Sequence, residues 1–266
     1  MNRILSKKNR VLLAELVRTD FKLRYQGSVL GYAWSLLKPL LLFVILYIVF
    51  VYFLKIGKDV PHYPVYLLLG IVLWNFFNET TSQSLGSIVG RGDLIRKIRI
   101  PRWVIVFSSS ISALINLFLN LIVVGIFMVI NQVPLTPTIL LLPFNIIEIY
   151  LFALGVSLFL SAAYVKFRDV SYIWEVVLQA GFYATPIIYP LSMITSVFVQ
   201  KLLLLSPIAQ AVQDARYNTV THQALTSGIL YHSFVYVVLP MVVVAVTLVG
   251  GIAYFRKESK YFAENI

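Results

Sequence analysis

Glutamates inside apolar stretches are the first residues in this sequence that could do chemistry. Glu79, Glu148 and Glu175 stand among hydrophobic neighbours, where an ionisable group is costly and usually faces protein or water. A proton-coupled transporter needs such a group deep in the bilayer. A plainer interpretation exists for each, since Glu175 falls near the expected end of its helix and Glu148 can bond to neighbouring helices. Proton coupling therefore stays an open alternative.

Polar and small residues recur every three or four positions in three long apolar segments, so each set falls on one helical face. One interpretation is helix packing sealed by hydrogen bonds and close backbone approach, and the other is a hydrated path. The sets are Asn75, Asn78, Glu79, Ser82 and Gly86; Ser109, Ser112, Asn116 and Asn120; and Ala153, Ser157 and Ser161.

Aromatic residues are plentiful, with 16 Tyr, 18 Phe and 4 Trp. Most are expected to face lipid or pack, and some to form interfacial belts. An aromatic passage would also suit sugars, whose C–H faces stack on rings without tight directional bonds, so that a polymer can slide. The candidate path residues are Phe43, Tyr47, Glu79, Tyr183 and Tyr189.

The composition places the chain among integral membrane proteins. Of its 266 residues 59% are hydrophobic and 12% charged, whereas soluble domains are about a quarter charged. The absence of cysteine excludes disulfides, thiol catalysis and cysteine-ligated metals. The net charge of +11 is typical of a cytoplasmic excess of Lys and Arg rather than of nucleic-acid binding.

The apolar segments predict an all-α fold with six transmembrane helices. A span needs about 20 apolar residues, and five segments satisfy this, while Val170–Thr185 forms the core of another span. We expect a cytoplasmic N-terminal part (1–32), a transmembrane domain (33–255) and a cytoplasmic tail (256–266). The five segments are Ala33–Leu54, Tyr66–Val89, Val104–Ile130, Ile139–Val165 and Phe234–Phe255.

Prolines interrupt the region between the fifth and sixth spans, at Pro186, Pro190 and Pro207. We expect Ile187–Leu205 to form one or two short helices that enter the membrane and leave on the same side, acting as a re-entrant gate. An irregular outer loop on the bilayer surface is the alternative.

Basic residues predict the orientation of a multi-pass protein of the bacterial cytoplasmic membrane, with both termini cytoplasmic. With six spans, all but four of the 22 Lys and Arg residues lie inside, as the positive-inside rule requires. A full crossing by Ile187–Leu205 would place the basic tail outside, which favours the re-entrant interpretation. The four outer residues are Lys55, Lys58, Lys201 and Arg216.

The N-terminal segment fits an amphipathic helix over Arg10–Gln26, with apolar residues every four positions. Such a helix lies in the interface plane. Asp20 and Arg24 are four apart and can pair, and Gly27 and Gly31 permit a sharp turn into the first span.

The inner loop Gly90–Arg102 is long enough for a short helix. Asp93 can cap its start, and Leu94, Ile95 and Ile98 would form an apolar face in need of a partner surface. The alternative is a basic loop that fixes orientation and binds anionic lipid.

Four motifs, taken in order, resemble the membrane subunit of ABC exporters for cell-surface polysaccharides. The stretch RTDFKLRYQGSVLGYAWSLLKPL carries Arg24-Tyr25, Leu30-Gly31, Trp34 and Pro39. The others are GRGDLIRKIRIPRW, KFRDVSYIWEVVLQAGFYATPIIYP and LSPIAQ, the last with Ser206-Pro207 where the family often has Asn-Pro. The resemblance covers essentially the whole chain.

The resemblance implies a homodimeric permease paired with two copies of a separate ATPase, which would bind ATP and magnesium. It also implies that the N-terminal helix, with Asp20 and Arg24, and the loop of Asp93 contact that ATPase. The chain has no Gly-x-x-x-x-Gly-Lys-[Ser/Thr] loop of its own, so we expect a transport subunit and not an enzyme, with no cofactor on this chain.

The expected cargo is a lipid-linked glycan, such as an O-antigen, a teichoic acid or a rhamnose-rich polymer. An exporter of a small lipid or drug from the same superfamily is the nearest alternative. A proton-coupled secondary transporter is another, although the hydropathy shows no inverted repeat. A membrane enzyme would need Asp, Glu or His residues clustered at one membrane face, and in this chain these residues are scattered.

Overall fold

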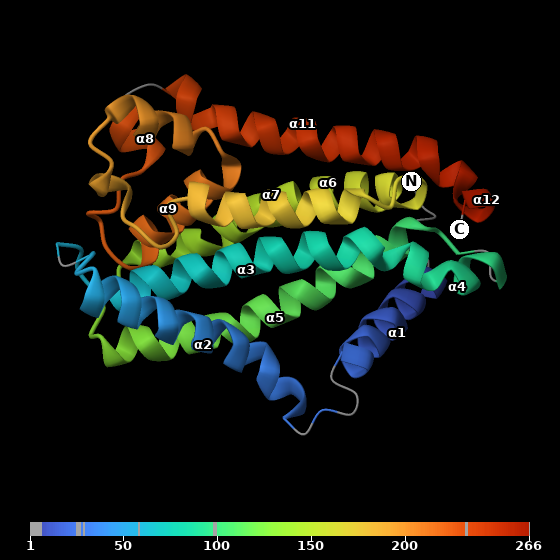
Figure 1. Ribbon diagram of the computed structural model, residues 1–266, viewed down its shortest axis with the longest axis horizontal. Helices are drawn as coiled ribbons and strands as arrows, with labels where there is room; N and C mark the ends of the chain where they lie inside the picture. The colour runs from blue at the N-terminus through green and yellow to red at the C-terminus, as the bar shows by residue number, and fades with distance from the viewer. Residues whose placement is uncertain are drawn as a thin grey trace.

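The structure is a computed structural model, and it describes residues 7–24, 28, 30–57, 59–97, 100–231 and 234–265. Every regular element in these residues is helical, and the long helices run side by side along one axis (Figure 1). The longer elements are α1 (Lys7–Arg24), α2 (Trp34–Tyr47), α3 (Tyr63–Ser87), α5 (Trp103–Ile130), α6 (Leu142–Lys166), α7 (Val170–Ala184), α9 (Pro207–Thr219) and α11 (Phe234–Glu258).

Short elements connect the long helices. A π-helical segment, η2, extends α2, and 3-10 turns precede α2, α4 and α6. The short elements are η1 (Gly31–Ala33), η2 (Ile48–Phe53), η3 (Val89–Arg91), α4 (Gly92–Lys97), η4 (Pro137–Leu141), η5 (Leu191–Met193), α8 (Val197–Leu204), α10 (Ser227–Tyr231), η6 (Ser259–Tyr261) and α12 (Phe262–Asn265).

Four helices of the described chain are long and apolar enough to cross a membrane, namely Trp34–Phe53, Trp103–Ile130, Pro137–Lys166 and Val235–Tyr261. They coincide with four of the five long segments expected from sequence. The α3 helix is long but interrupted by polar residues, and α7 has only 15 residues. The all-helical membrane fold is therefore confirmed, while the count of six spans stays a prediction.

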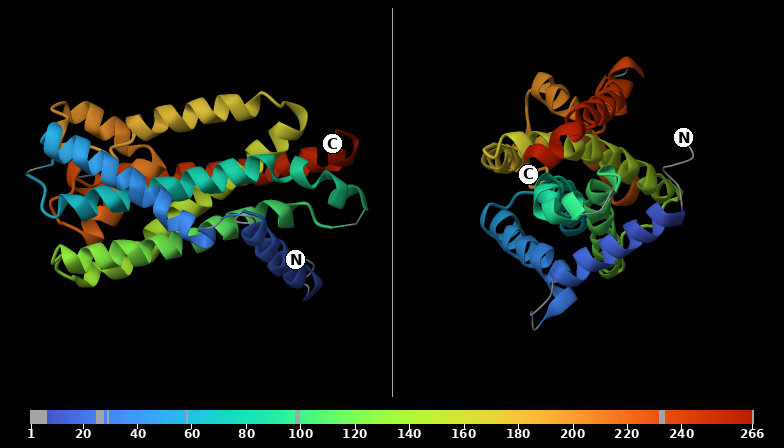
Figure 2. Two further views of the ribbon diagram at one scale, coloured as in Figure 1. Left: turned by 60° about the horizontal axis from the view of Figure 1, so that its bottom comes forward. Right: turned by 90° about the vertical axis from the view of Figure 1, so that its right-hand side faces the viewer.

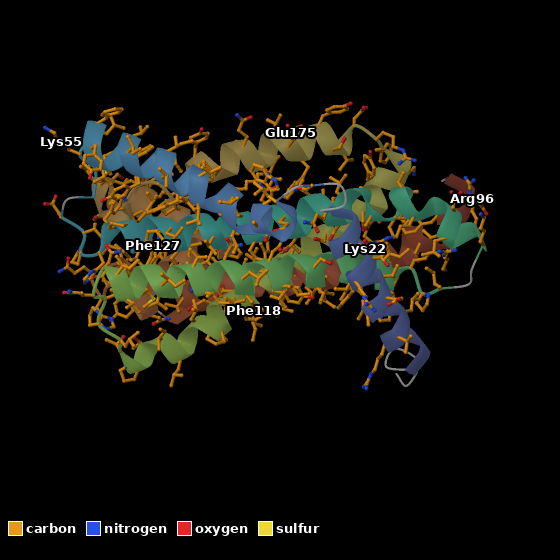
Figure 3. All side chains as sticks on the ribbon, turned by 90° about the horizontal axis from the view of Figure 1, so that it is seen from below. Lys22, Lys55, Arg96, Phe118, Phe127 and Glu175 are labelled. Atoms are coloured by element: carbon orange, nitrogen blue, oxygen red, sulfur yellow. The ribbon has the colours of Figure 1, made fainter. Side chains whose placement is uncertain are left out.

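The bundle has two distinct ends. One carries α8 and α9, and the other carries α4, α12 and the nearby start of α1 (Figure 1). Lys55 and Arg96 mark these opposite ends (Figure 3). The first and last helices thus lie at the same end of the bundle (Figure 1). The segment between α7 and α11 stays at the opposite end, whether or not it re-enters a bilayer.

The α3 helix forms the centre of the core. It contacts α2, α5, α6, α7 and α9, and its residues from Val65 to Trp74 are all buried. The α6 and α11 helices approach closely because both have glycine at the crossing. A Cβ atom on Gly155 would lie 2.7 Å from the backbone nitrogen of Leu248, and one on Gly251 would overlap the carbonyl oxygen of Gly155. Gly155 was not in the small-residue row expected on α6. That row contains Ser157, which faces α3 instead and donates a hydrogen bond of 3.2 Å to the carbonyl of Thr80.

The α1 helix lies across the direction of the long helices (Figure 2, right) and packs on α5. Gly31, with a φ of 49°, lies in the turn into α2, where a left-handed backbone favours glycine. Asp20 forms an ion pair with Arg91 of η3, which ties α1 to the connection after α3. The Arg24 side chain lies outside the described residues, so the expected Asp20–Arg24 pair stays a prediction.

Candidate translocation surface

The polar residues of α3 occupy its least buried face. Asn75, Asn78 and Glu79 are half-buried and Ser82 is exposed, although the intervening Phe76 and Phe77 are buried. A helix at the centre of a bundle normally buries its whole circumference. The face that α3 leaves uncovered is therefore the polar one, which favours the hydrated path over helix packing.

A groove between α2, α3 and α7, which we call the aromatic groove, opens onto this face. Its volume is about 730 Å³, and α2 and α7 stand on the same side of α3 in the view along the bundle (Figure 2, right). Its lining combines amide, hydroxyl and carboxylate groups with large rings: Leu42, Trp74, Asn75, Asn78, Ser82, Leu85, Ser171, Trp174, Glu175, Leu178, Gln179, Phe182 and Tyr183.

Ring contacts hold the walls of the aromatic groove in place. Trp74 of α3 packs on Phe182 of α7, with ring centroids 6.0 Å apart. The Trp174 ring nitrogen donates a hydrogen bond of 3.2 Å to the Thr81 hydroxyl. Gly181 lies against Trp74, where a Cβ atom would come within 2.8 Å of the indole. The short α7 is thus fastened to α3 along the groove.

A second groove, the acidic groove, lies between α2, α3 and α5 and has a volume of about 540 Å³. Glu79 lines it and accepts hydrogen bonds from Asn116 at 2.6 Å and from Gln83 at 2.7 Å. Asn75, Asn78 and Ser82 border both grooves. The polar face of α3 thus forms a ridge between two openings.

The predicted path residues divide between groove and core. Glu79 lines the acidic groove and Tyr183 the aromatic groove. Phe43 is buried and packs on Phe127, with centroids 5.4 Å apart, and its ring also contacts Tyr47. The structure brings Phe43 and Tyr47 together, but neither lines the two grooves in this chain.

The other two glutamates differ in their surroundings. Glu175 is exposed on α7 and lines the aromatic groove (Figure 3). Glu148 is buried in α6, and neither of its carboxylate oxygens has a hydrogen-bond partner within the described part of the chain. The helix-to-helix bond that seemed open to Glu148 is not formed there.

The predicted gate residues each stand at a helix boundary. The α7 helix ends at Ala184, two residues before Pro186, and Pro207 is the first residue of α9. Pro190 immediately precedes η5. Tyr189 donates hydrogen bonds of 3.2 Å to the carbonyls of Tyr183 and Ala184, which cover the end of α7. The prolines thus end or start helices as expected.

Arg216 fastens this broken segment to the core, and the sequence reasoning did not single it out. Its side chain is fully buried and donates to the carbonyls of Tyr66 at 3.0 Å, Pro186 at 2.5 Å and Ile187 at 2.6 Å. The guanidinium also lies 3.8 Å from the centroid of the Tyr66 ring. Gly70 leaves the space that the guanidinium occupies. The available signal was an arginine in the short segment between the last two apolar stretches.

The predicted coupling residues lie at the end of the bundle that carries α4. Asp93 is exposed in the first turn of α4, and Leu94 is half-buried. Ile95 packs against a cluster that includes Phe262 of the tail. Part of the apolar face of α4 is therefore covered by the same chain, which reduces the surface left for a partner. Ile98 lies outside the described residues.

The described residues contain no group of three His, Asp or Glu side chains that could hold a metal ion. The residues that line the two grooves offer hydrogen bonds, ring stacking and charge.

Comparison with known proteins gives consistent matches. The family model described as "ABC-2 type transporter" matches residues 12–220. The "O-antigen export system permease protein RfbA" of Myxococcus xanthus is 29% identical, over 97% of this chain and 96% of its own length. Two proteins of the same name from Klebsiella pneumoniae are 28% and 26% identical, each over 95% of this chain and 94% of its own length.

Proposed function

Because the chain belongs to the ABC-2 type transporter membrane family, we propose that it is the membrane subunit of an exporter for a cell-surface polysaccharide. The names of its relatives support this cargo class. The observation that carries the proposal is the uncovered polar face of α3 beside the rings of the aromatic groove.

The groove chemistry suits a glycan. Amides and hydroxyls from Asn75, Asn78, Ser82 and Ser171 offer hydrogen bonds. Trp74 and Trp174 offer flat apolar surfaces to the C–H faces of sugar rings. The rings do not fix one register, because stacking lacks tight directional bonds, so successive sugars can use the same contacts.

The finer parts of the proposal concern assembly and energy. The groove is open on one side in the single chain, and a second copy placed over it would complete a path for a polymer. ATP hydrolysis belongs to a partner ATPase, two copies to a complex, acting on the end that carries α4. The cargo is lipid-linked, and the chain makes six crossings of the bacterial cytoplasmic membrane, with a re-entrant segment after α7 and both termini cytoplasmic.

An exporter of a small lipid or drug would use the same surface. The two functions can be told apart by their cargo. A small-molecule exporter would still transport its cargo in cells that make no surface polymer. Proton-coupled transport differs in its energy source, because it would continue without the ATPase.

The experiment uses the absence of cysteine from the sequence. A single Cys at Ser82 or Ser171 in the aromatic groove is modified with a bulky thiol reagent in cells that display the polymer, and surface polymer is measured. We expect export to fall at least tenfold. Phe118→Cys is the control, because Phe118 is exposed on α5 and points away from the bundle (Figure 3).

Equal loss of export at Phe118 and at the groove positions would overturn the assignment of the groove. Unchanged export after full modification at both groove positions would overturn it too. Deleting the partner ATPase gene should abolish export, and persistence of export would contradict the proposed energy source.

A further inference from the structure

A third groove, which we call the apolar groove, lies on the other side of α7. It is bounded by α6, α7 and α11, and its volume is about 550 Å³, within the 300–1,000 Å³ typical of ligand pockets. Val156, Phe159 and Leu160 form one wall, and Ile173 and Trp174 form another. Such a lining suits a hydrocarbon chain.

Glycines of α11 form the floor of the apolar groove. Gly251 packs against Gly155 of α6, so it has no space for a side chain. The adjacent Gly250 is exposed, and a Cβ atom added there would meet nothing within 4 Å. The space above Gly250 is therefore open, and a side chain at this position would enter the groove without disturbing the helix contact.

Basic residues stand at the three helix ends nearest to one end of the apolar groove. Lys166 ends α6 about 9 Å beyond Leu160, at a rise of 1.5 Å per residue. Arg168 comes two residues before Val170, which lines the groove. Arg256 and Lys257 are in the last turn of α11. All four are exposed.

Nearby acids do not neutralise these cations. Asp169 follows Arg168 in the sequence, and Glu258 follows Lys257. Within the described chain, neither acid forms a salt bridge with any of the four cations. Lys166 and Arg168 instead lie over the rings of Phe167 and Tyr164, at 5.4 and 5.1 Å from the centroids. Four cations against two acids leave the groove end with a net positive charge.

We propose that the apolar groove binds one anionic phospholipid, with an acyl chain along the groove and its phosphate among Lys166, Arg168, Arg256 and Lys257. An apolar trough that ends in a cluster of cations matches the two parts of such a lipid, because cations near a membrane surface attract anionic headgroups. The site lies in the leaflet at the end of the bundle that carries α4 and α12. The inference does not depend on the proposed cargo.

The lining favours a membrane phospholipid over a lipid that carries a glycan. Thr247 and the indole of Trp174 are the polar groups in this lining, so little could bind a sugar. The polar side chains face the aromatic groove, from which α7 separates this one. An occupant whose headgroup stays at the membrane surface therefore fits best.

The test uses the purified protein in nanodiscs with photoactivatable analogues of phosphatidylglycerol and phosphatidylcholine that carry the reactive group in the acyl chain. We expect the phosphatidylglycerol analogue to label α6, α7 or α11 at least threefold more strongly. Gly250→Leu should fill the groove and reduce that labelling at least fivefold. Gly125→Leu is the matched control, because a Cβ atom added to Gly125 of α5 would also meet open space, and this glycine lies outside the groove.

A second pair of variants tests the headgroup. Arg256→Gln with Lys257→Gln should remove the preference for phosphatidylglycerol while leaving acyl-chain labelling by both analogues. Arg10→Gln with Arg18→Gln removes the same charge from α1 and should leave the preference intact. This pair keeps the proposal testable even where Gly250→Leu fails to fold.

Three results would overturn the proposal. The first is equal labelling by the two analogues in the unmodified protein. The second is labelling that Gly250→Leu leaves unchanged in folded protein. The third is displacement of the label by an isoprenyl phosphate but not by phosphatidylglycerol, which would assign the groove to a carrier lipid.

Discussion

The α3 and α5 helices carry polar residues at the same spacing, yet the two sets have different surroundings. On α5, Ser109, Ser112 and Asn120 are at most 7% exposed. On α3, Asn75 is half-buried and Ser82 is exposed beside two grooves. Ser109 and Ser112 of the α5 set are therefore packing residues, and Asn116 and Asn120 border the acidic groove. The α3 set is an open surface.

The difference lies in what each face meets. The Ser112 hydroxyl donates to the carbonyl of Ser108 at 3.0 Å, and the Asn120 amide to the carbonyls of Asn116 at 2.8 Å and Ser35 at 3.3 Å. The first two bonds stay within α5, and the bond to Ser35 joins α5 to α2. On α3, Glu79 bonds to Asn116 of α5, whereas Asn75, Asn78 and Ser82 line the two grooves. The spacing of polar residues therefore shows that they lie on one face of a helix, but it does not show what that face contacts.

Enlarging a residue of the α5 set should have the largest effect on stability. Ser112 is 1% exposed, so Ser112→Phe should destabilise the fold by about 1–3 kcal/mol or more through overpacking. Ser82→Phe on α3 should fold normally, because that side chain is exposed. Thermal melting in detergent measures both. Equal destabilisation by the two changes would contradict the assignment of Ser112 to a packed face and of Ser82 to an open one.

Removing the hydrogen bond between Glu79 of α3 and Asn116 of α5 should have the second-largest effect on stability. Replacing Glu79 with Leu leaves the Asn116 amide without its acceptor, and an unsatisfied buried donor costs about 1–3 kcal/mol. Glu79→Gln keeps an acceptor oxygen and should restore most of the stability. Melting temperatures of the two variants compare the effects. A Gln variant as unstable as the Leu variant would show that the hydrogen bond is not the cause.

Removing amides from the α3 set should change transport more than stability. We expect Asn75→Ala with Asn78→Ala to alter the free energy of unfolding by less than about 1 kcal/mol, since these groups are only half-buried. Export should fall severalfold, because a cargo loses two hydrogen-bonding groups. Surface polymer and melting temperature are measured together. Normal export in the double variant would remove this face from the path.

Ser109→Ala on α5 should have the smallest effect. The Ser109 hydroxyl donates only to the Ile105 carbonyl of its own helix, at 3.4 Å. We expect a change below about 0.5 kcal/mol and normal export. A clear loss of export with unchanged melting would place the α5 set in the path as well.

The long helices were predictable because bilayer-length apolar runs leave few alternatives. The expected Val104–Ile130 became α5 (Trp103–Ile130), and the expected core Val170–Thr185 became α7 (Val170–Ala184). Pro186 explains the end of α7, because a proline disfavours the helical conformation of the residue before it, here Thr185. The assignment of α3 as a span rests on its length, because its polar face lowers its hydropathy.

The candidate site was predictable only in part. The stripe with Asn75 and Ser82 was found from spacing, but its exposure depends on how α2 and α7 stand beside α3. The ion pair of Asp20 joins residues 71 positions apart, and Ile95 meets the distant Phe262. Local patterns carry no information about such contacts.

The position of Arg216 in the chain has a consequence for biosynthesis. The carbonyls of Pro186 and Ile187 are made 30 and 29 residues before the guanidinium that binds them. Until then these acceptors lack that partner, and burying them would be costly. The ribosome therefore synthesises the irregular segment after α7 before it synthesises Arg216, which binds that segment. We expect protease to cleave residues 186–190 in stalled nascent chains in which these residues have left the ribosome while residue 216 is still inside it. Chains in which α9 has also emerged should resist cleavage there. Folding at this end of the bundle thus waits for translation.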